Sequence, residues 1–218
     1  MPRFSVLIMP SAFSLLLRYT WLCGLCLCLL LASGARAAPT RLMVLGDSIS
    51  AAYGMSLQQG WVSLLADELR DGDIAVINAS ISGETTDGAL RRLPALLETH
   101  APDLVIIELG GNDGLRGFPL ATLRENLTQL VTQSQAAGAE VLLLPMHIPP
   151  NYGRRYTEAF HTSFAEVAQA TGAGLGPFIL DGIAGRPELM QGDGIHPQPE
   201  AQAQMLANVL PAIREALQ

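Results

Sequence analysis

The sequence LMVLGDS at residues 42–48 places a serine directly after a short apolar run. Four consecutive apolar residues, from Leu42 to Leu45, are typical of a strand that is covered on both faces of a parallel sheet. Gly46 permits a sharp turn where this strand ends, and the carboxyl ends of parallel strands line the active crevice of open α/β sheets. We therefore expect Ser48 to lie where such a protein would hold a nucleophile.

Strand-like and helix-like patterns alternate along the rest of the chain. Apolar runs predict strands at residues 41–45, 74–78, 104–109, 141–146 and 175–179. Helical periodicity predicts helices at residues 59–70, 86–99, 120–137, 156–170 and 199–217. This alternation favours an α/β fold in which a five-stranded parallel sheet lies between two layers of helices, a three-layer α/β/α sandwich.

The first 37 residues differ from the rest of the chain in composition. Arg3 and Arg18 precede an apolar segment at residues 21–33, and the small residues at 35–37 suit a cleavage site. We predict a signal peptide at residues 1–37 and a single domain at residues 38–218 that is periplasmic or secreted. Because residues 4–17 are also apolar, an uncleaved membrane anchor remains the alternative.

Charge and cysteine content limit the partners of the predicted mature domain. Removal of residues 1–37 takes away all three cysteines and leaves 10 basic against 20 acidic residues, a formal charge of about −10. This charge argues against nucleic acid as a partner and against adhesion to anionic membranes. No His, Cys and carboxylate residues have the spacing of metal ligands, so we expect neither a metal nor another cofactor. We also expect a monomer that has no stable membrane insertion after the signal peptide is removed.

Asp193 and His196, near the other end of the chain, supply an acid and a base within four residues. With Ser48 they complete a set in which the carboxylate orients the imidazole and the imidazole accepts the serine proton. Each residue also has a simpler interpretation, since Ser48 could cap a helix and Asp193 could belong to a turn beside a surface histidine. The three residues together favour catalysis.

Two glycine-containing segments follow the second and third predicted strands. Gly83 follows the second strand, and its N–H could approach a substrate oxygen without side-chain obstruction. Asn112 follows the third strand, and its side-chain N–H could donate to the same oxygen. Taken singly, each is also what an ordinary turn contains. Because neighbouring strands end at one edge of the sheet, the pair predicts an oxyanion hole.

At these positions the chain resembles the GDSL, or SGNH, hydrolase family. The four residues that mark the family match Ser48, Gly83, Asn112 and His196. Segments 78–83, 108–117 and 151–156 are most similar to a bacterial subgroup of thioesterases, lysophospholipases and arylesterases, and the resemblance extends over residues 41–217.

The resemblance implies a flavodoxin-like sheet and a catalytic triad of Ser48, Asp193 and His196. It also implies an oxyanion hole formed by the N–H groups of Ser48 and Gly83 together with the side chain of Asn112. Such a site transfers an acyl group through a covalent acyl-enzyme.

The segment after Asn112 is the candidate substrate-binding loop. Residues 114–119 contain two glycines that permit backbone change, and we expect Gly114, Leu115 and Phe118 to contact the substrate. The resemblance implies that this loop moves over a bound acyl chain.

The expected function is hydrolysis of carboxylic esters and thioesters of fatty acids, with a small-molecule fatty acyl substrate as the partner. Two alternatives remain open. One is a carbohydrate acetylesterase with the same catalytic residues and a polar groove for a sugar. The other is a noncatalytic α/β binding domain that retains an inactive triad.

Overall fold

The computed structural model describes residues 39–218. The predicted signal peptide at residues 1–37 lies outside the described residues and therefore stays a prediction. Within residues 39–218, no helix has both the length and the apolar character needed to cross a membrane.

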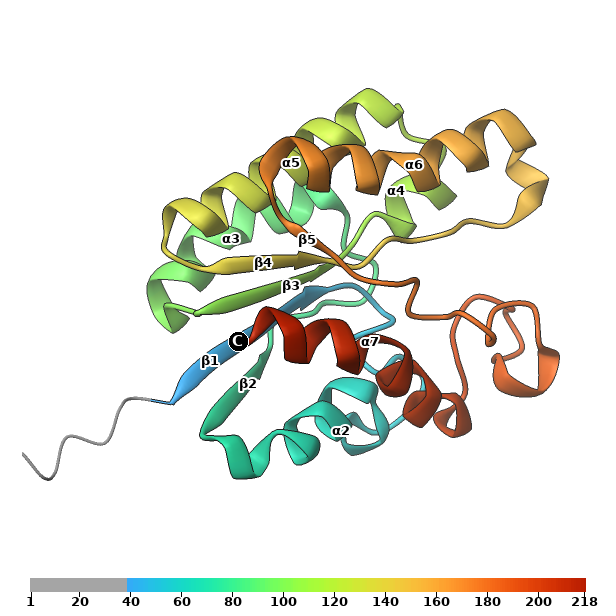
Figure 1. Ribbon diagram of the computed structural model, residues 1–218. Coiled ribbons are helices and arrows are strands. Elements are labelled where there is room, and N and C mark those ends of the chain that lie inside the picture. The colour runs from blue at the N-terminus through green and yellow to red at the C-terminus, as the bar shows by residue number, and fades with distance from the viewer. Residues whose placement is uncertain (1–38) are drawn as a thin grey trace, which may run out of the picture. The chain divides into compact units, whose positions relative to one another are not determined.

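The described residues contain a sheet of five parallel strands (Figure 1). In chain order the strands are β1 (Thr40–Gly46), β2 (Ile74–Asn78), β3 (Leu104–Glu108), β4 (Glu140–Leu143) and β5 (Gly174–Leu175). Their order across the sheet is β2-β1-β3-β4-β5. This is the doubly wound order of flavodoxin-like proteins, and it confirms the predicted α/β fold.

Helices cover both faces of this sheet (Figure 1). On one face lie α3 (Thr86–His100), α5 (Leu120–Ala136) and α6 (Arg154–Thr171), and on the other lie α2 (Trp61–Glu68) and α7 (Gln202–Ala216). The short helix α4 (Gly111–Leu115) follows β3. Single 3₁₀ turns occur at Leu57–Gln59, Arg70–Gly72, Pro150–Tyr152, Pro187–Leu189 and Pro199–Ala201.

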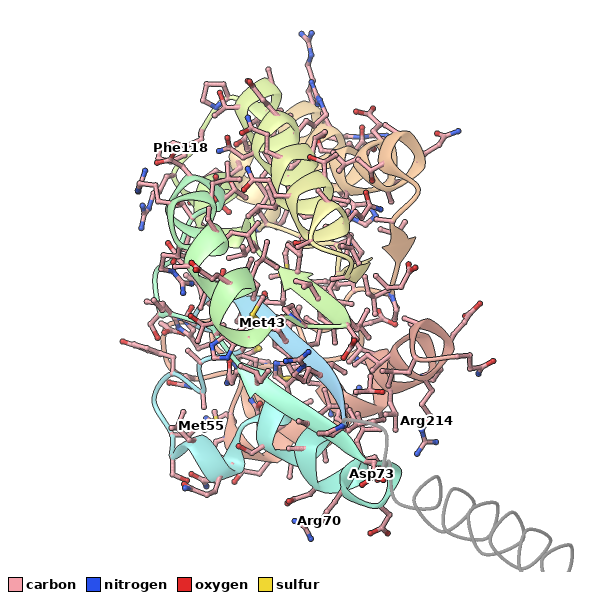
Figure 2. All side chains as sticks on the ribbon, turned by 90° about the vertical axis from the view of Figure 1, so that its left-hand side faces the viewer. Met43, Met55, Arg70, Asp73, Phe118 and Arg214 are labelled. Atoms are coloured by element: carbon pink, nitrogen blue, oxygen red, sulfur yellow. The ribbon has the colours of Figure 1, made fainter. Side chains whose placement is uncertain are left out.

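The apolar run at residues 42–45 forms the centre of the core. Leu42, Met43, Val44 and Leu45 are all 0% exposed, because β1 pairs with β2 on one side and β3 on the other. Figure 2 shows Met43 in the interior of the described residues. Burial of each such side chain contributes roughly 1.5–3 kcal/mol. Strand β1 is therefore a firm support for the residues that follow it.

The sheet order places a crevice at the carboxyl ends of β1 and β3. From β1 the chain passes to β2 on one side and then to β3 on the other, so the connections diverge at this point. Ligands of doubly wound sheets bind where the strand order reverses in this way. Gly46 is in register with Glu108, so the last residues of β1 and β3 lie side by side at the crevice.

The structure differs from the sequence prediction chiefly at β4, β5 and α4. Strand β4 ends at Leu143, two residues before Pro145. Strand β5 holds only Gly174 and Leu175, because Pro177 has no N–H with which to continue the pairing. Helix α4 stands where the sequence predicts the start of a loop. The sequence does not favour a helix there because two of the five residues are glycine, a poor helix former.

Candidate active site

Ser48 lies two residues beyond the end of β1, and His196 reaches it from the loop between β5 and α7. His196 Nε2 is 2.8 Å from Ser48 Oγ, and His196 Nδ1 is 2.6 Å from Asp193 Oδ2. The structure thus brings the three predicted triad residues into one hydrogen-bonded chain, although 148 positions separate Ser48 from His196. In this arrangement a histidine can take the serine proton while a carboxylate orients the imidazole.

The carboxylate of Asp193 is held by its own loop. Its Oδ1 accepts hydrogen bonds from the backbone N–H groups of Ile195 at 2.9 Å and His196 at 3.0 Å. Partial burial acts to raise the pKa of Asp193, but the hydrogen bonds from the backbone and imidazole of His196 and the backbone of Ile195 outweigh it and lower the pKa to about 2. The carboxylate is therefore charged throughout the neutral range, as a group that orients an imidazole must be.

Asn112 lies in the first turn of α4 and lines the same cavity as Ser48. Asn112 Nδ2 donates a hydrogen bond to Asp47 Oδ2 at 3.0 Å, and the backbone N–H of Ile49 donates to Asp47 Oδ1 at 3.0 Å. One N–H of the Asn112 amide remains for a substrate oxygen. Burial raises the pKa of Asp47 to about 6. Asp47 therefore ties the predicted oxyanion donor, Asn112, to the backbone directly after Ser48.

A buried polar network supports the turn that carries Ser48. Ser50 Oγ donates to Glu108 Oε2 at 2.7 Å, and Trp61 Nε1 donates to Ser50 Oγ at 3.2 Å. Burial, together with the nearby charge of Asp47, raises the pKa of Glu108 well above its usual value. Within residues 39–218, Glu108 Oε1 has no hydrogen-bond partner. Glu108 therefore keeps its proton to a higher pH than an exposed glutamate does.

A second buried carboxyl fixes α4 against the start of α3. Asp113 accepts hydrogen bonds from the backbone N–H of Thr86 at 3.0 Å and from Thr86 Oγ1 at 2.6 Å. Asn126 Nδ2 in turn donates to Thr86 Oγ1 at 3.0 Å. Burial raises the pKa of Asp113. The helix that presents Asn112 is thus fastened to two neighbouring helices.

Gly83 lies in the segment after β2, which continues alongside the end of β1. The N–H of Ala79 donates to the carbonyl of Val44 at 2.9 Å, and the N–H of Ile81 donates to the carbonyl of Gly46 at 3.1 Å. Gly83 has a φ of +80°, which favours glycine, and a Cβ built on it meets no atom within 4 Å. Gly83 is therefore exposed to solvent, but it is not among the residues that line the cavity beside Ser48 and Asn112.

A cavity of about 500 Å³ is lined by Ser48 and His196 and by apolar side chains from the segments that follow β1, β3, β4 and β5. The apolar lining residues are Ile49, Leu115, Met146, Ile148, Pro149, Pro150, Phe178, Leu180, Ala184, Met190 and Ile195. A mostly apolar hollow with a few polar groups is typical of a small-molecule site. Within the described part of the chain, no three His, Cys, Asp or Glu residues are grouped so as to hold a metal ion.

Of the three residues predicted to contact the substrate, the structure places only Leu115 in the cavity wall. Gly114 is buried inside α4, where a Cβ would lie 2.7 Å from both Ile148 and Phe160, so its role there is close packing. Phe118 is 38% exposed, and Figure 2 shows it at the periphery. Its carbonyl accepts a hydrogen bond from Tyr156 Oη at 2.8 Å.

Sequence reasoning missed most of the cavity wall. Met146 and Ile148 follow β4, and Phe178 and Met190 follow β5. The signal that could have found them is their place beyond the carboxyl ends of strands, the same rule that located Ser48 and Asn112.

Comparison with known proteins places the fold and site in one class of hydrolases. Residues 44–204 match the GDSL-like Lipase/Acylhydrolase family, and the chain belongs to this family. This confirms the resemblance found in the sequence. Esterase TesA of Pseudomonas aeruginosa is 51% identical over 194 residues, which cover 88% of this chain and 96% of that protein. Thioesterase 1/protease 1/lysophospholipase L1 of Escherichia coli (strain K12) is 46% identical over 166 residues, which cover 76% of this chain and 79% of that protein.

Among solved structures, the psychrotrophic esterase EstA from Pseudoalteromonas sp. is similar with a TM-score of 0.79 at 49% identity. The match covers 82% of this chain and 98% of EstA, and the EstA structure is inhibited by monoethylphosphonate. Family membership together with relatives at this level of identity makes the present chain an enzyme of the hydrolase class.

Proposed function

We propose that this protein is a serine esterase and thioesterase that acts on fatty acyl substrates, including lysophospholipids and aryl or short-chain esters. The observation that carries the proposal is the hydrogen-bonded chain from Ser48 through His196 to Asp193 in the wall of a largely apolar cavity. The names of two relatives, an esterase and a thioesterase and lysophospholipase, support the same substrate class.

The geometry supports acyl transfer in two halves. Ser48 Oγ attacks the carbonyl carbon while His196 Nε2 takes the hydroxyl proton, and the carbonyl oxygen becomes an oxyanion. The N–H groups of Ser48 and Gly83 and the amide of Asn112 are the proposed donors to this oxyanion. Collapse breaks the C–O or C–S bond, and His196 returns its proton to the departing alcohol or thiol. Water then attacks the acyl-enzyme with His196 as base, which releases the fatty acid and restores Ser48.

The cavity favours a fatty acyl group over a sugar. Each methylene that is buried against apolar side chains such as Ile148, Phe178 and Leu180 contributes about 0.8 kcal/mol to binding. A carbohydrate acetylesterase would need polar groups along this wall to pair with sugar hydroxyls. The apolar lining therefore makes that alternative the weaker one.

The proposed place of action is the periplasm or the outside of the cell, and the proposed form is a monomer without stable membrane insertion. The composition of residues 1–37 supports export. All three cysteines lie within these residues, so an oxidising compartment poses no risk of disulfide errors to the remaining chain.

A fluorophosphonate probe tests the proposal, since it reacts covalently with an activated serine. Wild-type protein should be labelled and should hydrolyse acyl esters and thioesters. Ser48→Ala should lose labelling and at least about a thousandfold of activity while its circular dichroism is unchanged. Ser63→Ala, which loses a hydroxyl that bonds to the carbonyl of Leu57, is the matched control and should behave as wild type. A wild-type protein without labelling would favour the noncatalytic binding domain.

A further inference from the structure

A residue outside the predicted triad lies against the His196 imidazole. The ring of Tyr53 packs on it with centroids 4.2 Å apart and ring planes inclined by 33°. Tyr53 is 48% exposed, and it does not line the cavity. Its ring is therefore placed against the base and not in the core or in the acyl pocket.

The backbone that carries Tyr53 is strained. Ala52 has a φ of +56°, and Gly54 has a φ of +76°. For a residue other than glycine, the left-handed conformation is unfavourable, so the surrounding structure must impose it. The N–H of Tyr53 donates to the carbonyl of Ser48 at 3.2 Å, and a Cβ on Gly54 would collide with the Gln191 amide. The turn is thus fixed between the nucleophile and Gln191.

Gln191 joins this turn to the loop that holds His196. Gln191 Nε2 donates to the carbonyl of Tyr53 at 2.8 Å and to the carbonyl of Pro197 at 3.0 Å. The backbone N–H of Gln191 donates to the carbonyl of His196 at 2.7 Å. A path of hydrogen bonds therefore runs from the Ser48 carbonyl through Tyr53 and Gln191 to the base, independent of the bond between Ser48 and His196.

We propose that Tyr53 is a positioning residue for His196 and that Gln191 holds Tyr53 in place; the proposal rests on the proposed serine hydrolase function. The loop of His196 contains no α-helix or paired strand, but only 3₁₀ turns at Pro187–Leu189 and Pro199–Ala201 and the isolated bridge between Met190 and Pro197. A catalytic group that moves by 1 Å can lose about 100-fold in rate. A base on an irregular loop therefore needs support from outside the loop, and the Tyr53 ring supplies it.

The aromatic face has a second consequence for the reaction. His196 becomes an imidazolium each time it takes the Ser48 proton, and a cation within about 6 Å of an aromatic centroid is stabilised by the ring. The Tyr53 ring, at 4.2 Å, meets this condition. Both effects come from the aromatic ring of Tyr53 and not from its phenolic hydroxyl, so Tyr53→Phe should preserve the function.

The rate of Ser48 modification by a small fluorophosphonate isolates this role. Fluoride is its leaving group, so the rate depends on the geometry of nucleophile and base and not on contacts to an alcohol or thiol. Tyr53→Ala should react about 10- to 100-fold more slowly than wild type, with kcat for esters reduced and KM little changed. Tyr53→Phe should restore nearly the wild-type rate. Leu57→Ala, a neighbouring side chain that is 62% exposed, is the control and should match wild type.

The role of Gln191 is tested by the same measurement, with a second glutamine, Gln135, as the matched control. Gln191→Ala should slow phosphonylation in the same direction as Tyr53→Ala. Gln135→Ala removes a comparable hydrogen bond, from Gln135 Nε2 to the carbonyl of Thr171 at 3.2 Å, far from the sheet edge that carries the site. It should leave the phosphonylation rate unchanged.

Several results would overturn the positioning role while leaving the proposed function intact. One is wild-type labelling of Tyr53→Ala, and another is a raised KM with unchanged phosphonylation, which would make Tyr53 a substrate contact. A loss of phosphonylation rate that follows a lowered melting temperature would make the role of Tyr53 structural. If Tyr53→Ala folds poorly, Tyr53→Leu separates the structural role from the positioning role, because it keeps the bulk of the side chain without the aromatic face. Failure of the wild type itself to react would instead refute the proposed function.

Discussion

At the scale of single residues, Asn112 is oriented before any substrate arrives. Its amide donates to Asp47 Oδ2, which fixes the direction of the remaining N–H. Asn112→Ala should lower kcat by about 10²–10³, or roughly 3–4 kcal/mol, because the donor acts on charge that develops in the transition state. Steady-state kinetics with one ester measures this, and KM should change less. A raised KM with unaltered kcat would make Asn112 a ground-state binding residue.

Glu108 makes the stability of the protein depend on pH. Its folded pKa is raised well above 4.5, so the folded state keeps a proton that the unfolded state releases above that pH. The contribution of Glu108 to the free energy of unfolding is therefore fully present below about pH 4.5, and it declines as the pH rises toward the folded pKa. Glu108→Gln removes the titration, so its melting temperature relative to wild type should rise between pH 5 and pH 8. Thermal melts of both proteins across this pH range make the measurement. Parallel curves of melting temperature against pH for the wild type and Glu108→Gln would contradict the predicted role of Glu108.

The predicted catalytic residues were the part of the candidate site most open to sequence reasoning. Ser48 and Asn112 follow strands, and Asp193 and His196 form a compact motif, so strand ends and spacing suffice to find them. Gln191 has no such signal. Its importance comes from two carbonyls, one of them 138 positions away, and only the folded backbone brings these together.

At the scale of elements, α4 places Leu115 in the wall of the cavity that we propose for the acyl chain. Leu115 lies at its end and lines the cavity, whereas Phe118 lies beyond it at the periphery. Leu115→Ala should therefore reduce kcat/KM for dodecanoyl esters more than for acetyl esters, because buried methylenes contribute about 0.8 kcal/mol each. Phe118→Ala is the comparison and should show no such dependence on chain length. An equal loss on acetyl, hexanoyl and dodecanoyl esters would remove Leu115 from the acyl site.

Helices could be predicted from the sequence where a hydrophobic period was long. The prediction failed where tertiary contacts decide the structure. The periods behind α3, α5 and α6 gave bounds within two residues of those observed. Helix α4 has five residues and two glycines, and it forms because Asp113 is fastened to Thr86 and because Gly114 fits against Ile148 and Phe160. Tertiary contacts of this kind are invisible to periodicity.

At the scale of the whole molecule, the order of strands and helices was enough to predict a parallel three-layer α/β/α sandwich, whereas the flavodoxin-like sheet was implied by the resemblance to the family. Continuous apolar strands can be buried only if helices cover both faces, and right-handed crossovers then leave few topologies. The arrangement of the cavity wall was not predictable, because segments after β4 and β5 have irregular backbone whose path depends on packing.

Export can be tested on the whole chain. If residues 1–37 are a signal peptide, the mature protein should begin at Ala38 or one residue later. Its activity should be indifferent to thiol reductants, because the remaining chain has no cysteine. N-terminal sequencing of the exported protein makes the measurement. Recovery of the intact leader in washed membranes would favour the uncleaved anchor.

The shortness of β5 has a consequence for encounters between molecules. A sheet edge with free N–H and C=O groups can accept a strand from another chain and so begin aggregation. Here the edge consists of Gly174 and Leu175, and Pro177 follows within two residues without an N–H to offer. A foreign strand would find too few donors in a row to hold it. This side of the sheet is thereby closed to the addition of strands from other molecules.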